Sequence, residues 1–304
     1  MKVLISGGTG FVGRFIAEEL FAAGHDVVVT GRTRPADGFF SRPVGFATAE
    51  LGTGRDWRAL FEGVDAFVHA AFHHLPGRYR GGEGEDPKGF RQRNLDGSAA
   101  LFEAARAAGV ARTVFISTRA VYGTQPAGAV LTEDTVPRPD TLYGEIKLAA
   151  ERRLAALCGA GFTGTSLRVT GVYGPAGAGQ AHKWSGLFDD FLAGRPIEPR
   201  VSTEVHGTDL ATAVSLMLSA PIEVVTRRTF NVSDIVLDRS ELLAILREVA
   251  ATTSSPPPAA DPSGLNIMDC TRLKALGWQP GGRPLLARTA RQLGRQAAAI
   301  RVVP

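Results

Sequence analysis

The chain has 304 residues, of which 44% are hydrophobic and 21% charged, a composition typical of a soluble globular protein with a large core. Lysine and arginine number 34 against 30 aspartates and glutamates, and no basic run is interleaved with aromatic residues, which argues against a nucleic-acid partner. The two cysteines, Cys158 and Cys270, stand far apart, and no stretch approaches the roughly 18 apolar residues of a membrane span. We therefore expect a cytoplasmic protein without a metal site, disulfide or membrane anchor.

A glycine-rich turn follows the first predicted strand. Residues 3–6 are apolar without alternation, as in a strand that is buried on both faces. Glycines spaced by three then lead into an amphipathic helix that stops at Gly24. This arrangement lets a pyrophosphate approach the free N–H groups at the start of a helix, so it predicts a dinucleotide site. The expected cofactor contacts here are Gly7, Thr9, Gly10, Phe11, Val12 and Gly13.

The second predicted strand, at 27–30, leads into arginines instead of a carboxylate. A carboxylate at this place would bind the ribose 2′-hydroxyl of NAD, whereas a guanidinium suits the 2′-phosphate of NADP. We therefore expect NADP as the preferred cofactor and NAD as the second choice, with Arg32 and Arg34 binding the phosphate. The alternative is that Arg32 is a solvent-exposed loop residue.

Two further strands are predicted at 46–51 and 65–71, with a helix at 55–62 between them. The residues at the ends of these strands are placed to contact the adenine and the nicotinamide ribose. These expected cofactor contacts are Glu50, Leu51, Ala70 and Ala71. His69, inside the second of these strands, is interpreted as a packed residue and not as a catalyst.

Residues 74–93 are rich in glycine and charge, and they predict a long loop that faces the substrate. His73, immediately before this loop, is a candidate substrate contact. Asn94 then opens a predicted helix at 95–108, where it is either the N-cap or a residue of the site.

A fifth strand, predicted at 113–118, ends in two hydroxyl residues. Hydroxyls at the carboxyl end of a parallel strand lie where open α/β sheets bind ligands. We expect Ser117 to contact the cofactor, and Thr118 and Arg119 to contact the substrate.

Tyr143 and Lys147 are four residues apart in a predicted helix that is rich in helix-forming residues. Both side chains therefore project from one face. A phenol has an ordinary pKa of about 10, and an ammonium one turn away lowers it by favouring the phenolate. Such a tyrosine can take a proton from an alcohol or give one to a carbonyl.

The order of these motifs resembles that of the extended short-chain dehydrogenase/reductases, also called the NAD-dependent epimerase/dehydratase family. The resemblance rests on an ordered set of motifs that spans residues 3–280. The set comprises Gly7-x-x-Gly10-x-x-Gly13, Asp65 to Ala71, Asn94 to Gly97, Ser117-Thr118, Tyr143-x-x-x-Lys147, Leu167-Arg168, Val172 to Pro175, 205–211, 229–232 and 269–280. It implies an α/β fold: a doubly wound parallel Rossmann sheet with a small C-terminal substrate-binding lobe.

The resemblance also implies a role for each member of the site. Tyr143 is expected to be the acid/base, Lys147 to lower its pKa and to hold the nicotinamide ribose, and Thr118 to hydrogen-bond the reacting oxygen. Asn94 is expected to support the lysine through a water or the backbone, and Val172 to contact the cofactor. A homodimer is usual in this family, although no pattern in the chain demonstrates one.

The predicted domain boundaries are 1–170 with about 204–233 for the dinucleotide-binding domain, and 171–203 with 234–304 for the substrate-binding lobe. In the lobe, His182 and Trp184 belong to a glycine-rich segment beside the expected pocket. They are candidates for substrate contact, with an ordinary loop surface as the alternative.

Two departures from the family bear on the reaction. Sugar-nucleotide dehydratases of this family carry an Asp-Glu pair after the position of Thr118, where this chain has Arg119 and Ala120, so dehydration is not expected. Nucleotide-sugar epimerases usually carry an arginine four residues before the position of His206, against the diphosphate, and this chain has Ser202. A simpler sugar or a small hydroxy or keto compound therefore fits as well as a nucleotide sugar.

Together these features predict an NAD(P)-dependent oxidoreductase that interconverts a secondary alcohol and a ketone on a small, sugar-like substrate. The alternative is a redox-neutral sugar epimerase that retains its cofactor. A non-catalytic nucleotide-sensing protein is a third possibility, disfavoured because Tyr143 and Lys147 are both present.

Overall fold

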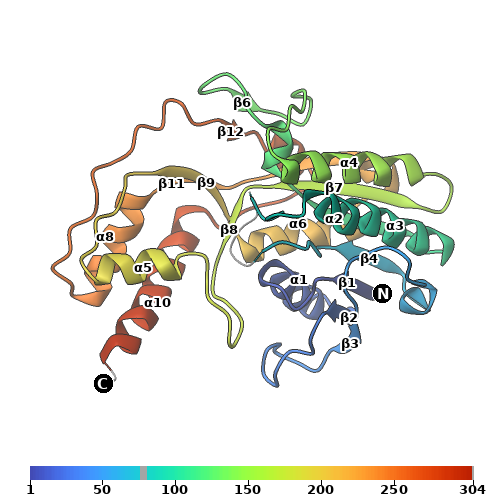
Figure 1. The fold of residues 1–304 in the computed structure, drawn as a ribbon, viewed down its shortest axis with the longest axis horizontal. Helices are drawn as coiled ribbons and strands as arrows, with labels where there is room; N and C mark the ends of the chain where they lie inside the picture. Colours follow the sequence, from blue (N-terminus) through green and yellow to red (C-terminus); the bar gives the residue numbers. More distant parts are fainter. Residues whose placement is uncertain (76–80, 303–304) are drawn as a thin grey trace.

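The computed structural model describes residues 1–75 and 81–302. Its main sheet has seven parallel strands in the order β10-β7-β5-β4-β1-β2-β3 (Figure 1). The strands are β1 (Lys2–Ser6), β2 (Asp26–Gly31), β3 (Gly45–Thr48), β4 (Ala66–His69), β5 (Arg112–Thr118), β7 (Thr163–Val169) and β10 (Arg228–Val232). The expected doubly wound Rossmann fold is confirmed.

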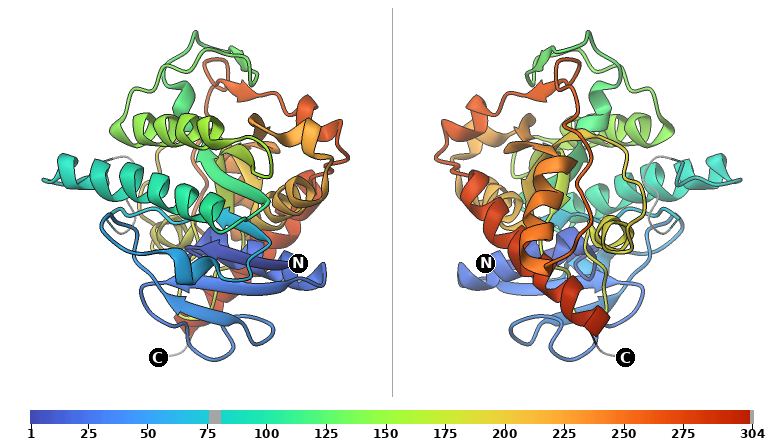
Figure 2. Two further views of the ribbon diagram at one scale, coloured as in Figure 1. Left: turned by 90° about the vertical axis from the view of Figure 1, so that its right-hand side faces the viewer. Right: turned by 90° about the vertical axis from the view of Figure 1, so that its left-hand side faces the viewer.

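Helices cover both faces of this sheet, which explains why its central strands are apolar without alternation. Val3 and Ile5 of β1 belong to the core that α1 (Phe11–Ala22) and α6 (Gly207–Ser219) cover. Leu4, between them, belongs to the opposite core, under α3 (Gly97–Ala107) and α4 (Leu142–Leu157). The two views in Figure 2 show these helices on either side of the sheet.

The remaining chain forms smaller units. A three-stranded sheet, β11-β9-β8, lies next to three helices that share an apolar cluster of their own (Figure 1). These elements are β8 (Gly171–Tyr173), β9 (Val201–His206), β11 (Ile235–Asp238), α5 (Ser185–Leu192), α8 (Arg239–Ala250) and α10 (Gly282–Val302). The short elements are β6 (Val130–Leu131) paired with β12 (Ile267–Met268), α7 (Ile222–Val225) and α9 (Thr271–Lys274). The domain boundaries given above stay a prediction.

Some element predictions between β2 and α3 were wrong. The third strand ends at Thr48, and the helix predicted at 55–62 is only the short 3₁₀ helix η1 (Arg58–Phe61). The predicted loop at 74–93 contains α2 (Pro87–Arg91) and runs into a π-helix, η2 (Gln92–Asp96), while its residues 76–80 lie outside the described ranges. Asp86 caps α2 by accepting from the Gly89 N–H, with Pro87 at the first helical position, so a start signal was present in the sequence.

The C-terminal helix is joined to the main body by carboxylates. Asp209 of α6 accepts a hydrogen bond from the Gly281 N–H at 3.1 Å, and Asp234 accepts from the Gly282 N–H at 2.9 Å, at the start of α10. The Trp278 indole donates to the Asp209 carbonyl at 2.8 Å. In the described ranges no helix is long and apolar enough to cross a bilayer.

Candidate active site

Helix α4 carries the predicted acid/base pair. The Thr141 hydroxyl caps its start by accepting from the Gly144 N–H, which sets the register of the first turn. Tyr143 is half-buried, whereas Lys147, one turn later, is only 4% exposed. Glu151 follows after another turn and is 5% exposed, so three polar side chains repeat along one face.

The Lys147 ammonium is enclosed by a carbonyl and two aromatic rings. It donates to the Ile116 carbonyl at 2.7 Å, and it lies 4.7 Å from the ring centres of both Phe72 and Phe115. Burial lowers the pKa of Lys147 to about 7, while the Glu151 carboxylate acts in the opposite direction.

Phe72 also packs edge-on against Tyr143, with ring centres 5.0 Å apart. It therefore contacts both members of the acid/base pair. Sequence reasoning missed Phe72, because an aromatic residue after a strand gives no signal that it will lie against a helix about 70 residues later.

Ser117 and Arg168 both bind Glu151, which lies one helical turn after Lys147. The Ser117 hydroxyl donates to one carboxylate oxygen of Glu151, and Arg168 binds the other at 2.8 Å. Because the Ser117 hydroxyl donates its proton to Glu151, the Ser117 side chain could only accept a hydrogen bond from a cofactor.

Thr118 is the last residue of β5 and is 8% exposed. Its oxygen accepts from the Ala120 N–H at 3.2 Å, so the hydroxyl proton can still be donated to a substrate oxygen. The guanidinium of Arg119, the next residue, donates to the Asn266 carbonyl at 3.0 Å. This contact ties Arg119 to the segment before β12.

Asn94 holds the loop after β4. It lies in the π-helix η2, a feature that is frequent at functional sites. Its amide accepts from the His73 N–H at 2.7 Å and donates to the His73 carbonyl at 2.8 Å. Asn94 is therefore not a helix cap, and the contacts of its side chain are with His73 and with the Phe90 carbonyl.

A series of buried hydrogen bonds connects this π-helix to the last residue before the glycine loop. The Ser98 hydroxyl donates to the Asn94 carbonyl, so it accepts from Nε2 of His69 at 2.8 Å. Nδ1 of His69 then accepts from the Ser6 hydroxyl at 2.6 Å. Burial lowers the pKa of His69 to about 3, consistent with a neutral, packed histidine.

The glycine loop has the shape that a dinucleotide needs. Gly7 has a φ of +71°, and a Cβ there would come 2.7 Å from the Ala71 Cα. A Cβ on Gly13 would overlap the Gly7 carbonyl oxygen. The N-cap of α1 is Gly10, which has no side chain to cap the helix, so the first N–H groups of α1 remain to bind an anion. These residues fit a pyrophosphate, with Thr9, Phe11 and Val12 in the same turn.

Three predicted cofactor contacts lie together beyond this loop. Glu50, Leu51 and Ala71 line one small cavity. Arg32 is exposed after β2, and Arg34 lies with its guanidinium 5.0 Å from the Phe46 ring centre.

His73 belongs to this side of the site as well. Burial lowers its pKa, and nearby Arg93 and Arg32 lower it further. His73 therefore lies near Arg32 and Glu50, which are predicted cofactor contacts, and its contact with the substrate stays a prediction.

The segment that follows β8 crosses the glycine loop. The Gln180 amide donates to the Thr9 carbonyl at 2.9 Å, and Arg14 of α1 donates to the Pro175 carbonyl at 2.9 Å. We call residues 175–180 the strap. Sequence reasoning gave this segment only to the substrate lobe, because nothing local to it shows that it returns to residue 9.

Two predicted substrate contacts lie just after the strap. Trp184 is 5% exposed and stacks on Tyr173 with ring centres 5.0 Å apart, which places it in the core of the C-terminal lobe and not on a loop surface. His182 accepts from the Trp184 N–H at 3.2 Å. Lys183, between them, pairs with the buried Glu204 carboxylate. Val172, predicted to contact the cofactor, is half-buried in β8.

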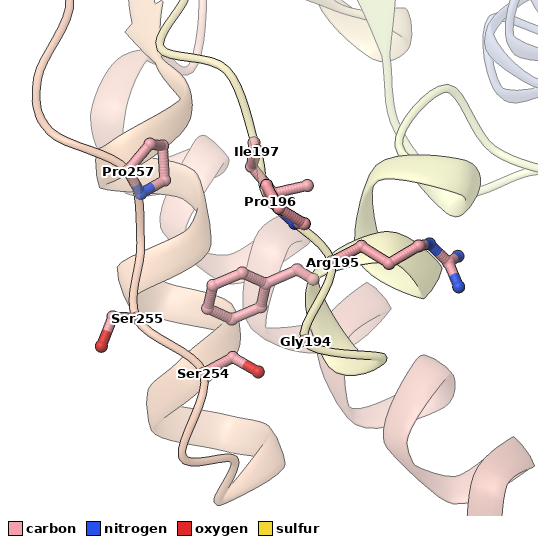
Figure 3. A pocket seen from close by; sticks show the side chains of 8 residues that line it. Gly194, Arg195, Pro196, Ile197, Ser254, Ser255 and Pro257 are labelled. Carbon is pink, nitrogen blue, oxygen red and sulfur yellow. The ribbon is translucent and has the colours of Figure 1, made fainter.

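A surface hollow on the C-terminal lobe is unrelated to this site (Figure 3). Its lining comes from the end of α5 and from the proline-rich segment after α8, and the one titratable side chain in it, Arg195, is paired with Asp190. The lining residues are Phe191, Gly194, Arg195, Pro196, Ile197, Ser254, Ser255 and Pro257. None of them belongs to the acid/base constellation on α4.

Comparison with known proteins agrees with this geometry. A model of the NAD dependent epimerase/dehydratase family matches residues 3–233. The chain is 31% identical to a UDP-glucose 4-epimerase from Corynebacterium glutamicum, over 92% of this chain and 91% of that relative. The solved structure of a Thermus thermophilus UDP-glucose 4-epimerase complex with NAD has a TM-score of 0.77 at 28% identity, covering 97% of this chain and 99% of its own. MoeE5 in complex with UDP-glucuronic acid and NAD has a TM-score of 0.79 at 26% identity, covering 98% and 100%.

The matched range contains the glycine loop, Asn94, Thr118, Tyr143 and Lys147. The chain therefore belongs to the NAD-dependent epimerase/dehydratase family and is an NAD(P)-dependent enzyme of the extended short-chain dehydrogenase/reductase type.

Proposed function

We propose that the protein is a sugar epimerase that inverts a secondary alcohol through a ketone and keeps its NAD throughout. The observation that carries the proposal is the placement of Tyr143 and the buried Lys147 on one face of α4. The epimerase was the alternative prediction above. It is better supported than an oxidoreductase that exchanges NADP, because the Corynebacterium glutamicum relative and the Thermus thermophilus structure are both named as UDP-glucose 4-epimerases, and the latter is solved with NAD.

Tyr143, Lys147 and Thr118 each have a distinct role in the proton transfer. Tyr143, as phenolate, takes the proton from the sugar hydroxyl and later returns it to the same oxygen. Lys147 favours the phenolate while it is charged. Thr118 donates its hydroxyl proton to the reacting oxygen and fixes its position. The glycine loop would hold NAD, which would supply the redox chemistry as the acceptor of a hydride from the sugar carbon and as its donor to the opposite face of the ketone.

The strap supports retention of the cofactor. It is joined to the glycine loop through Gln180 and Thr9, and to α1 through Arg14 and Pro175. A pyrophosphate on the first turn of α1 would lie next to this segment, so these two contacts would slow its exchange. A redox-neutral epimerase needs no exchange, whereas a dehydrogenase must release its cofactor in each cycle.

The substrate is a UDP-sugar or a free sugar. UDP-sugars are the first candidates, because the similar proteins act on UDP-glucose or are solved with UDP-glucuronic acid. Ser202 stands where an arginine is usual, and its hydroxyl donates to Glu204 at 2.9 Å. Free sugars are therefore the second candidates.

The test is to incubate the protein with UDP-glucose and without added nucleotide, and to follow formation of the C4 epimer by chromatography. We expect turnover, and a loss of about 10²–10⁴-fold in Tyr143→Phe. Tyr173→Phe is the matched control, because the Tyr173 hydroxyl is buried without a hydrogen-bond partner among the described residues.

The nucleotide that is released on denaturation tests the cofactor separately. We expect NAD in a ratio of about one per chain, as retention implies. If NADP is released instead, the prediction that Arg32 binds the 2′-phosphate is supported. Empty protein that reduces ketones with added NADPH would favour the oxidoreductase over the epimerase.

A further inference from the structure

The Phe72 ring contacts both members of the acid/base pair. Its centre is 5.0 Å from that of the Tyr143 ring, with the two planes at 86°, and it is 4.7 Å from the Lys147 ammonium. Aromatic rings favour this edge-to-face arrangement, and the face of a ring attracts a cation. One side chain from the loop after β4 therefore acts on two groups of α4.

Phe72 is itself held in two ways. Its ring packs edge-on against Phe90, which is 1% exposed, with ring centres 5.5 Å apart. The backbone of the next residue, His73, is bound by the Asn94 side chain through both its N–H and its carbonyl. These contacts fix the position of the Phe72 ring relative to α4.

The Phe72 ring is also the outer part of the enclosure around Lys147. The other two groups that enclose the ammonium, the Ile116 carbonyl and the Phe115 ring, both come from β5 in the middle of the sheet. Phe115 is 1% exposed, whereas Phe72 is partly exposed. Removal of the Phe72 ring would therefore open the ammonium to water.

We propose that Phe72 is a positioning residue for the proton transfer: its ring orients the Tyr143 ring and keeps water away from the Lys147 ammonium. The proposal adds a residue to the machinery of the proposed function and rests on it for the roles of Tyr143 and Lys147. Sequence spacing gives no sign of this residue, because it acts through side chains of another element.

The charged and titratable groups around Lys147 do not explain its low pKa. They are Tyr143 and Glu151 on α4 and His69 on β4. Glu151 raises the pKa of Lys147, and His69 stays neutral because its own pKa is about 3. Burial lowers the pKa of Lys147 to about 7, and the Phe72 ring supplies part of that burial.

The first test measures the titration of Lys147 without cofactor or substrate. Trace acetylation with acetic anhydride over a range of pH, followed by mass spectrometry of the peptide that contains Lys147, gives the pH at which the free amine forms. We expect a midpoint of about 7 in the wild type. In Phe72→Ala the midpoint should rise by about 1–2 pH units, because water then stabilises the charged form.

Phe46→Ala is the matched control for this labelling. Phe46 is also partly buried and also lies under a cation, Arg34, but it belongs to β3. Its removal should leave the midpoint of Lys147 unchanged. If Phe72→Ala does not fold, Phe72→Leu takes its place, with a smaller shift expected in the same direction. An unchanged midpoint in the Phe72 variant, or an equal shift in Phe46→Ala, would overturn the proposal.

The second test is the pH profile of kcat for epimerisation of UDP-glucose. In Phe72→Ala we expect kcat at the optimum to fall about tenfold, because the Tyr143 ring loses its support. The alkaline limb should move to higher pH together with the labelling midpoint, since Lys147 then stays charged longer. A lower kcat with both limbs unmoved would reduce Phe72 to a packing residue and overturn the proposal. A shifted midpoint in a protein that epimerises no sugar would support the enclosure of Lys147 and refute only the proposed reaction.

Discussion

At the scale of single residues, the chemistry of Lys147 is set by what encloses it. Its ammonium has the Ile116 carbonyl as an acceptor and the rings of Phe72 and Phe115 on two further sides. Aromatic faces attract a cation but replace little of the hydration that it loses. The pKa therefore falls to about 7, which puts the loss of the lysine charge near neutral pH.

Lys147→Met should change how stability depends on pH. Between pH 7 and 9 the folded wild type loses this proton, whereas the unfolded chain, with the ordinary pKa of 10.5, keeps it. The unfolded state then binds more protons, so the wild-type free energy of unfolding rises with pH. We expect a rise of about 2 kcal/mol over this window that is absent in Lys147→Met, measured by denaturant unfolding. Parallel curves for the two proteins would refute the lowered pKa.

At the scale of elements, the glycine loop depends on contacts between backbone atoms. Gly13→Ala would place a methyl group on the Gly7 carbonyl and so push α1 away from the loop. We expect little or no retained NAD in the purified variant and a melting temperature lower by several degrees. Gly186→Ala is the matched control, since a Cβ at that position in α5 meets open space. Full retention of NAD by Gly13→Ala would show that the loop does not need this close approach.

The elements that sequence reasoning predicted best are those with a strong local pattern. Buried strands such as β1, and the capped helix α4, follow directly from apolar runs and helix-forming residues. The region between β2 and α3 was harder to predict. The π-helix η2 depends on Asn94 binding the backbone of His73, and no local periodicity encodes a contact 21 residues away.

In the site as well, features with a local pattern could be predicted, and contacts between distant segments could not. The positions of Tyr143 and Lys147 follow from a spacing of four residues in one helix. The contacts of Phe72 with this pair, and of Gln180 with Thr9, join segments that are 71 and 171 residues apart in sequence. These contacts arise only when the sheet brings the segments together, so residue type and spacing could not reveal them.

At the scale of the whole molecule, the start of the C-terminal helix α10 is hydrogen-bonded to two aspartates from other elements. Asp209 and Asp234 accept from the N–H groups of Gly281 and Gly282. Opposing effects act on the Asp209 carboxylate. The start of a helix favours a negative charge by about 0.3–1 kcal/mol, whereas burial and the nearby Asp234 carboxylate disfavour it. The pKa of Asp209 is raised to about 6, so burial is the larger effect.

Asp209→Asn tests this balance. Asparagine keeps an oxygen to accept from Gly281 and carries no charge. In the wild type the folded state holds a proton that the unfolded chain, with a pKa of 3.8, has released, so stability is lost as the pH rises through about 6. We expect the variant to be more stable than the wild type by about 2 kcal/mol at pH 7.5, and the difference to shrink towards pH 4, as measured by unfolding at both pH values. A variant less stable than the wild type at pH 7.5 would mean that the charge at the start of α10 holds the lobe in place.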